Sequence, residues 1–204
     1  MEHMNFEWRK TTKNDIKKFN NWHTKVLEAG KKDNASLVKK YLSDKEPLLG
    51  STVLTLTDNL NSKYHTKSFT ATFKGEPVGF VVCMVNQNLK SESKRLHIYG
   101  VTVNPDLVDN GVGTAMIFDI VKFRKKFFDA NINLVTTTIK NNNVYAKGAF
   151  SNVGFEKVKE ENPKQKSITY YQLQTRKTSY YNNDELDEKM AETMKFVQEN
   201  VKGK

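Results

Sequence analysis

Residues 95–128 read R-L-H-I-Y-G-V-T-V-N-P-D-L-V-D-N-G-V-G-T-A-M-I-F-D-I-V-K-F-R-K-K-F-F, and this segment carries the clearest structural signal in the chain. Its first part, residues 96–103, is β-branched and apolar and stops before Pro105, which predicts a β-strand. Its last part repeats apolar residues at intervals of three to four, which predicts a helix reaching residue 128 with one buried face. The loop between them contains Gly111 and Gly113. A strand, a glycine loop and a helix in this order can direct backbone N–H groups at an anion such as a phosphate.

The same segment resembles the central motif of the GCN5-related N-acetyltransferases, the GNAT superfamily. In that family a strand ending in V-x-P is followed by [Q/R]-x-x-G-x-[G/A] at the start of a helix. The matching residues are Val103, Pro105, Gly111 and Gly113, whereas Val108 stands where the family prefers Gln or Arg. The resemblance therefore implies a pyrophosphate-binding loop whose N–H groups act without the Gln or Arg side chain that the family has at this position.

A second family pattern, N-x-x-A-x-x-x-[Y/F]-x-x-x-G-F, follows downstream at Asn143, Ala146, Phe150, Gly154 and Phe155. In the family it describes a helix and the strand after it. Two motifs in the family's order are stronger than either one alone. The resemblance covers residues 6–174, and its specific motifs lie within residues 96–155.

The fold class implied is α/β of the α+β type. It is the GNAT fold, a mixed central sheet of six or seven strands flanked by helices, with a parallel pair that splays apart. That pair would be residues 96–103 and 134–139, and pantetheine would enter the gap. A helix is also expected at residues 34–42. We expect one domain at residues 1–174, a linker at 175–183 and an amphipathic helix at 184–204 that packs on the domain or on a partner.

Composition narrows the function classes. The chain of 204 residues has a formal net charge of +10, and a cofactor with several phosphates suits that charge without nucleic acid. Nucleic acid ranks last among the partners because no reading motif is present. The single cysteine, Cys83, lies in an apolar run and is expected to be a buried small hydrophobe. No leader or long apolar span is visible, so we expect a cytoplasmic protein without membrane association.

By resemblance the cofactor is acetyl-CoA. Backbone N–H groups of Val101 and Val103 would hold the acetyl carbonyl and pantetheine, and loop residues 109–114 would hold the pyrophosphate. Asp109 is unusual beside phosphates and has helix capping as its alternative role; for Asn143, capping and cofactor binding are compatible. The full set of expected cofactor-binding residues is Val101, Thr102, Val103, Asp109, Asn110, Gly111, Val112, Gly113, Thr114, Asn143 and Phe150.

Proton transfer has two candidate residues, His97 and Tyr99. His97 lies on the strand where histone-acetyltransferase-like members carry a Glu base, and an imidazole can accept a proton from an ammonium. The competing interpretation is a strand histidine that faces the far side of the sheet. Alternation puts His97, Tyr99, Val101 and Val103 on one face unless a bulge interrupts the strand. Tyr99 is the candidate for acid or for acceptor positioning.

The family's usual acid, a Tyr, falls at Phe150, which has no hydroxyl. Tyr145 lies about 140° away on a helical wheel and is a poor substitute unless the helix is irregular. No His or Cys spacing indicates a metal site.

The expected function is an acetyl-CoA-dependent N-acetyltransferase in which a bound amine attacks the thioester directly. The alternative is a non-catalytic acyl-CoA-binding or interaction module, suggested by Phe150 and Val108. The acceptor amine is not specified by these residues. A monomer and a homodimer are both compatible with them.

Overall fold

The computed structural model describes residues 4–31, 42–43, 46–47, 66–87, 94–128, 131–158, 167–175 and 184–201. Its centre is a seven-stranded sheet in the order β1-β4-β5-β6-β7-β9-β8. The strands are β1 Glu7–Lys10, β4 Thr66–Phe73, β5 Glu76–Gln87, β6 Lys94–Val103, β7 Ile132–Lys140, β8 Glu156–Lys157 and β9 Ile168–Gln174. The helices are α1 Lys13–Lys31, α4 Val112–Lys122, α5 Arg124–Phe128, α6 Val144–Asn152 and α7 Asp184–Asn200, with a 3-10 turn at Pro105–Leu107. Strands β6 and β7 are parallel, so the expected mixed sheet with a parallel pair is confirmed.

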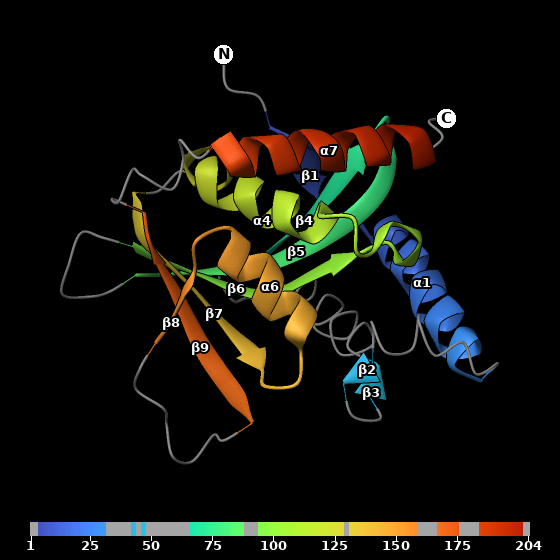
Figure 1. Cartoon of the computed structure of the whole chain (residues 1–204), viewed down its shortest axis with the longest axis horizontal. Helices are drawn as coiled ribbons and strands as arrows, with labels where there is room; N and C mark the ends of the chain where they lie inside the picture. Colours follow the sequence, from blue (N-terminus) through green and yellow to red (C-terminus); the bar gives the residue numbers. More distant parts are fainter. Residues whose placement is uncertain are drawn as a thin grey trace.

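The helices lie on both faces of the sheet. Figure 1 shows α7 lying along α4 at the top of the view, while α1 lies at the right, below the C-terminal end of α7. The main core joins α4 and α7 to the sheet through buried residues that include Met116, Ile120 and Val197. A smaller cluster on the α1 side contains Phe19 and Phe80, whose ring centroids are 4.0 Å apart.

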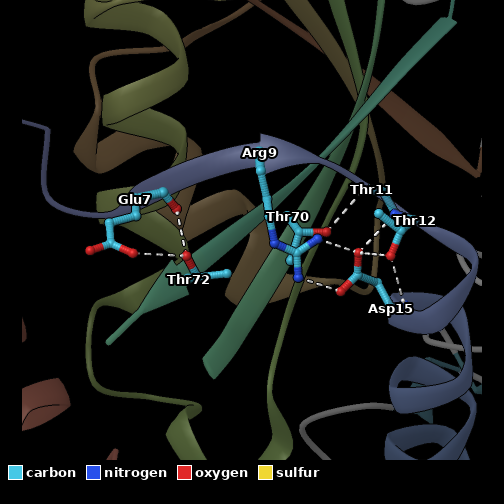
Figure 2. A network of polar contacts seen from close by, with 7 residues as sticks. All are labelled: Glu7, Arg9, Thr11, Thr12, Asp15, Thr70 and Thr72. Carbon is cyan, nitrogen blue, oxygen red and sulfur yellow. Dashed lines mark hydrogen bonds and ion pairs between the residues drawn. The ribbon is translucent and has the colours of Figure 1, made fainter. Parts of the chain in front are cut away.

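Helix α1 begins with a reciprocal cap that also ties it to β1 and β4 (Figure 2). The Asp15 carboxylate accepts hydrogen bonds from the Thr12 backbone N–H and hydroxyl, while the Asp15 N–H reaches the Thr12 hydroxyl. Arg9 of β1 donates to both oxygens of Asp15. The Thr11 and Thr70 hydroxyls, 3.0 Å apart, connect this corner to β4. The start of the helix is therefore set by polar contacts as well as by its apolar face.

The helix predicted to reach residue 128 is in fact two helices, because it breaks at Phe123. The Arg124 guanidinium donates to the carbonyl of Val121 at 2.9 Å and to that of Ile132 at 2.8 Å. These bonds satisfy a carbonyl at the end of α4 and attach the break to the start of β7. One of these contacts reaches another element of the fold, so the spacing of apolar residues along the sequence does not indicate the break.

Another expectation needs correction in the small β2–β3 hairpin, Leu42–Ser43 and Glu46–Pro47. A helix was expected at residues 34–42, but Leu42 pairs with Pro47 in the hairpin. The rest of that predicted helix, residues 34–41, lies outside the described residues, as do residues 176–183 of the predicted linker. The amphipathic segment after the linker forms α7, whose inward residues are Leu186, Met190, Thr193 and Val197.

A buried carboxylate fastens the start of the chain to the middle of α4. Asp119 is fully buried and accepts four hydrogen bonds: from Asn5 N at 3.0 Å, Asn5 Nδ2 at 2.9 Å, Phe6 N at 3.0 Å and Trp8 Nε1 at 2.9 Å. Burial raises the pKa of Asp119, although these donors oppose the shift. The four contacts hold β1 against α4, at one end of the sheet.

Candidate active site

The parallel strands β6 and β7 separate before either one ends. They pair from Lys94 with Ile132 to Ile98 with Thr137. In the described part of the chain, β6 then continues to Val103 without pairing with β7, while β7 stays paired with β9 through Lys140. The expected splay is therefore present, and the backbone of residues 99–103 faces a gap inside the sheet.

A cleft of about 640 Å³ occupies this gap and continues to the start of α4. Its walls come from the end of β6, the glycine loop, the end of β7 and one side of α6. All the site residues expected from the sequence line this cleft except His97 and Asn110. The Asn110 side chain instead donates to the Val108 carbonyl at 2.8 Å, which holds the turn of the loop.

The glycine loop enters α4 through a left-handed residue. Gly111 is the N-cap of α4, with φ +75°, and Asp109 two residues earlier has φ +67°. The N-cap position itself is therefore taken by Gly111, and capping by the Asp109 side chain stays a prediction. The first helical bond runs from Ala115 N–H to the Gly111 carbonyl at 3.0 Å. The N–H groups of residues 112–114 are in the first turn, where α4 itself offers them no carbonyl acceptor. The positive end of the helix dipole also lies here, so this end of the helix attracts an anion.

The two positions of the motif carry glycine for different structural reasons. A Cβ on Gly111 would collide with Oγ1 of Thr193 in α7. A Cβ on Gly113 would lie 3.5 Å from Cγ2 of Val103, which is an ordinary contact. Gly111 is thus favoured by its backbone angle and by the packing of α7, whereas a Cβ on Gly113 would make only an ordinary contact with the residues that the structure describes.

Helix α6 lines the cleft along a broad side. Asn143 caps it, with Oδ1 accepting from the Ala146 N–H at 3.0 Å, and also borders the cleft. Phe150 is 4% exposed and packs edge-on against Phe155 at 5.0 Å. Tyr145, which the helical wheel placed away from Phe150, lines the same cleft and is 44% exposed. The cleft therefore extends around more of α6 than the helical wheel suggested, and whether Tyr145 can replace the missing acid stays a prediction.

A bulge in β6 changes which way its side chains point. Val82 of β5 is opposite Gly100, but the next residue, Cys83, is opposite Ile98. Tyr99 is therefore an extra residue without a partner position on β5. An extra residue of this kind reverses the alternation of the strand beyond it.

The reversal separates the expected catalytic residues from the valines. Val101 and Val103 pack against the main core on the α4 side. His97 is paired with Met84, and the Tyr99 hydroxyl donates to Met84 Sδ at 3.7 Å, on the opposite face. The expectation that all four residues share one face is wrong. The side chain of Tyr99 still lines the cleft, since the bulge places it at the point where β6 and β7 part.

His97 is held beside Tyr99, behind the cleft. Its Nδ1 lies 2.9 Å from the Thr136 hydroxyl, and its ring meets the Tyr99 ring edge-on at 4.6 Å. Burial lowers the pKa of His97, and the positive charge of Arg95 lowers it further. The imidazole is therefore neutral near pH 7 and able to accept a proton.

Other chemistries find little support among the described residues. No group of three His, Cys, Asp or Glu side chains gathers there as a metal site would need. Cys83 is buried, and burial raises the pKa of its thiol. No helix in this part of the chain is long and apolar enough to cross a membrane.

A family model described as "Acetyltransferase (GNAT) family" matches residues 34–155, which is more than half of the chain. The chain belongs to the GNAT acetyltransferase family. No curated protein matched the sequence.

Solved structures share the fold at low identity. An acetyltransferase from Thermus thermophilus is 17% identical, with a TM-score of 0.54, over 85% of this chain and 99% of that chain. The Campylobacter jejuni N-acetyltransferase PseH in complex with acetyl coenzyme A is 13% identical, with a TM-score of 0.52, over 83% and 98%. An aminoglycoside N(6')-acetyltransferase from Legionella pneumophila is 14% identical, with a TM-score of 0.56, over 89% and 99%. At these identities the likeness establishes the fold alone.

Proposed function

We propose that the protein is an acetyl-CoA-dependent N-acetyltransferase in which a bound amine attacks the thioester directly. The observation that carries the proposal is the cleft between the diverging strands β6 and β7, which runs to the N-terminus of α4. Its shape suits an extended thioester attached to a pyrophosphate. The crystallised complex of C. jejuni PseH with acetyl coenzyme A, which shares the fold, supports this choice of cofactor.

In this proposal the backbone supplies most of the cofactor contacts. The N–H groups of residues 112–114 would receive the pyrophosphate at the positive end of α4. The edge of β6 that faces the gap would pair with the amide groups of pantetheine as a neighbouring strand would. The N–H groups of Val101 and Val103 are the candidates for the acetyl carbonyl. Their side chains pack partly against the core, so this contact would be made by their backbone.

The amine would approach from the sheet face that carries His97 and Tyr99. Attack forms a C–N bond and breaks the C–S bond, so a proton leaves the amine and another must reach the departing thiolate. We assign the first proton to His97, directly or through water, because its imidazole is neutral near pH 7. We assign the second to Tyr99, because its side chain both lines the cleft and contacts the His97 ring.

A non-catalytic acyl-CoA-binding module is the second candidate, because Phe150 offers no hydroxyl at the family's usual acid position. Loss of one general acid lowers a rate by about 10²- to 10⁴-fold and leaves positioning intact, so the enzyme remains preferred. A cytoplasmic location, where acetyl-CoA is made and used, fits this activity.

One experiment separates the two candidates. Thiol release from acetyl-CoA is measured against a panel of small-molecule, polyamine and peptide amines, and CoA carried by the purified protein is sought by native mass spectrometry. Amine-dependent thiol release supports the enzyme and names its acceptor class. Bound CoA without thiol release for any amine supports the binding module, and absence of CoA binding contradicts both.

A further inference from the structure

A second cavity, of about 310 Å³, adjoins the cleft at the glycine loop. Both cavities are lined by Asp109, Gly111, Thr114 and Asn152, so they lie next to each other around the start of α4. Helix α7, which lies along α4 in Figure 1, forms one wall of the second cavity. Its volume is at the lower end of the range of about 300–1,000 Å³ that small-ligand sites occupy.

Helix α7 lies outside the segment that the family model matches, residues 34–155. It nevertheless touches the loop directly, because Thr193 is packed so close to Gly111 that no side chain fits there. The part of the cavity wall that α7 forms therefore lies outside the matched family segment, whereas the part formed by the loop and Asn152 lies within it.

Phe196 contributes an aromatic side chain to the lining of the cavity. The inward face of α7 consists of Leu186, Met190, Thr193 and Val197, and Phe196 lies off that face. Its ring is partly buried at the edge of the core and lines the cavity. A planar base can stack on an aromatic ring of this kind.

The charges around the cavity favour an uncharged occupant with hydrogen-bond donors. Its described lining residues include the carboxylates of Asp109 and Glu192 and one ammonium, that of Lys189. Lys189 Nζ already lies 2.8 Å from the Glu185 carboxylate. A phosphate inside would meet more negative than positive charge, whereas amino and hydroxyl groups would find acceptors.

We propose that this cavity binds the adenosine end of acyl-CoA, with the adenine ring on Phe196 and the 3′-phosphate outside in solvent. The proposal rests on the proposed function, in which the pyrophosphate lies at residues 112–114. The next group along the cofactor after the pyrophosphate is the ribose and its base, and the neighbouring cavity is the one beneath α7. The appended helix is then a part of the cofactor site.

The test compares CoA with 4′-phosphopantetheine, which lacks the nucleoside, by calorimetry on the full chain. Phe196→Ala is expected to weaken CoA binding about 5- to 150-fold, the range for losing an aromatic stacking partner. It is expected to leave the affinity for 4′-phosphopantetheine unchanged, because that ligand ends before the cavity. Phe196→Leu, which keeps apolar packing but not the flat ring, is expected to lose part of the same CoA affinity.

Met194→Ala is the matched control, since Met194 lies on the same helix and is also partly buried against the core but does not line the cavity. It should leave the affinity for both ligands unchanged. If the wild type binds CoA and neither Phe196 variant weakens it, the inference is overturned while the proposed function stands. Equal losses for both ligands would also overturn it, because α7 would then act only by supporting the loop. A wild type that binds neither ligand would overturn the proposed function and the inference together.

Discussion

Tyr99 is directed into the cleft by one extra residue in β6. Without the bulge, the register of β5 and β6 would continue and the strand would present Tyr99 and Val101 on the same face. With it, the valines pack against the core and the phenol stands 47% exposed where the strands separate. Bulges of this kind are frequent beside active sites because they re-aim a single side chain.

The first prediction concerns this phenol. If Tyr99 protonates the departing thiolate, Tyr99→Phe should lower kcat by about 10²-fold or more and leave KM for acetyl-CoA nearly unchanged. Tyr145→Phe is the matched control, because Tyr145 lines the same cleft with similar exposure. Steady-state kinetics of both variants decide the assignment, and a larger loss at Tyr145 would transfer the role to α6.

The second prediction is a pH profile that depends on His97. A protonated imidazole cannot accept a proton, so the rate should fall as the pH drops through the pKa of His97. Burial and Arg95 lower that pKa, so the limb should lie below the ordinary histidine value of about 6.5. His97→Ala should remove the limb without changing CoA affinity.

Arg95→Gln provides the companion measurement, since loss of the nearby positive charge should move the same limb upward in pH. Titration of a free amine substrate would produce a limb that persists in His97→Ala. A His97→Ala protein with the wild-type rate and profile would make His97 a structural residue and leave water as the proton acceptor.

Among the elements, the junction of the glycine loop with α7 shows two kinds of glycine. Gly111 combines a left-handed backbone with a contact to Thr193, while Gly113 has neither. A substitution at the first should act on stability, and a substitution at the second should act on ligand binding.

The third prediction follows from this difference. Gly111→Ala should destabilise the protein by at least about 1–2 kcal/mol, because an L-residue is strained at positive φ and its Cβ would collide with Thr193. Gly113→Ala should leave stability unchanged or raise it by up to about 1 kcal/mol, yet weaken CoA binding by filling the space beside the phosphates. Chemical denaturation and calorimetry measure the two effects.

In a Thr193→Ala background the cost of Gly111→Ala should shrink, and an undiminished cost would show that the backbone angle alone is responsible.

The fourth prediction concerns the cap of α1 in Figure 2. Burial by itself would raise the pKa of Asp15, but hydrogen bonds from Arg9 and Thr12 together hold it below its ordinary value. Asp15 therefore contributes stability that is present above the unfolded-state pKa near 3.9 and is lost as the pH falls through the lower folded-state pKa.

Asp15→Asn should lose about 0.5–2 kcal/mol of stability at pH 7 and show a weaker loss of stability on acidification than the wild type. Denaturation midpoints between pH 7 and pH 3 provide the measurement. Asp187→Asn, an exposed carboxylate in the first turn of α7, is the control and should change stability little. Identical acid limbs in Asp15→Asn and the wild type would contradict the assignment.

The sequence predicted the central elements well because they are local. The strand ending before Pro105, the loop with Gly111 and the apolar spacing of the next helix each follow from neighbouring residues. The break at Phe123 was missed because its cause is an Arg124 bond to Ile132, a residue of another element. The face of His97 was left open, because a bulge was allowed for but the sequence does not show whether one occurs or at which residue.

The second cavity was missed for a related reason. The sequence shows that Phe196 is an aromatic residue off the apolar face of its helix. It does not show that α7 packs beside Gly111, which places Phe196 next to the glycine loop. The motif predicts which loop residues would bind the cofactor, and that role stays a prediction, whereas the positions of His97 and Tyr99 around the bulge required the structure.

At the level of the whole molecule, the start of the chain and the helix that would hold the phosphates form one unit. Asp119 joins them through donors more than a hundred residues away in sequence. Helix α4 also packs against α7, so it is held by the start of the chain and by the C-terminal helix.

The fifth prediction tests that unit. Asp119→Asn keeps the shape of the side chain but turns an amide NH₂ toward N–H donors, so at least one buried donor loses its acceptor. The expected cost is about 1–3 kcal/mol in the free energy of unfolding, measured by urea denaturation. Asp106→Asn, whose exposed carboxylate pairs with Lys25, is the control and should change stability little. A cost at Asp119 no larger than that at Asp106 would mean that β1 is held by its strand pairing alone.

Beyond Ile98, the side of β6 that faces β7 is unpaired, so it resembles an edge strand that lies in the interior of a sheet. Edges elsewhere attract other chains, but this one lies in a cleft between α4 and α6, where only a slender ligand with amide groups can follow it. On the proposed function, recognition there is carried by main-chain atoms, which every residue except proline possesses alike. Val101 and Val103 can then be exchanged for other strand-forming residues during evolution while the binding edge persists. On the proposed function, side-chain substitutions in this part of β6 can therefore accumulate without loss of cofactor binding.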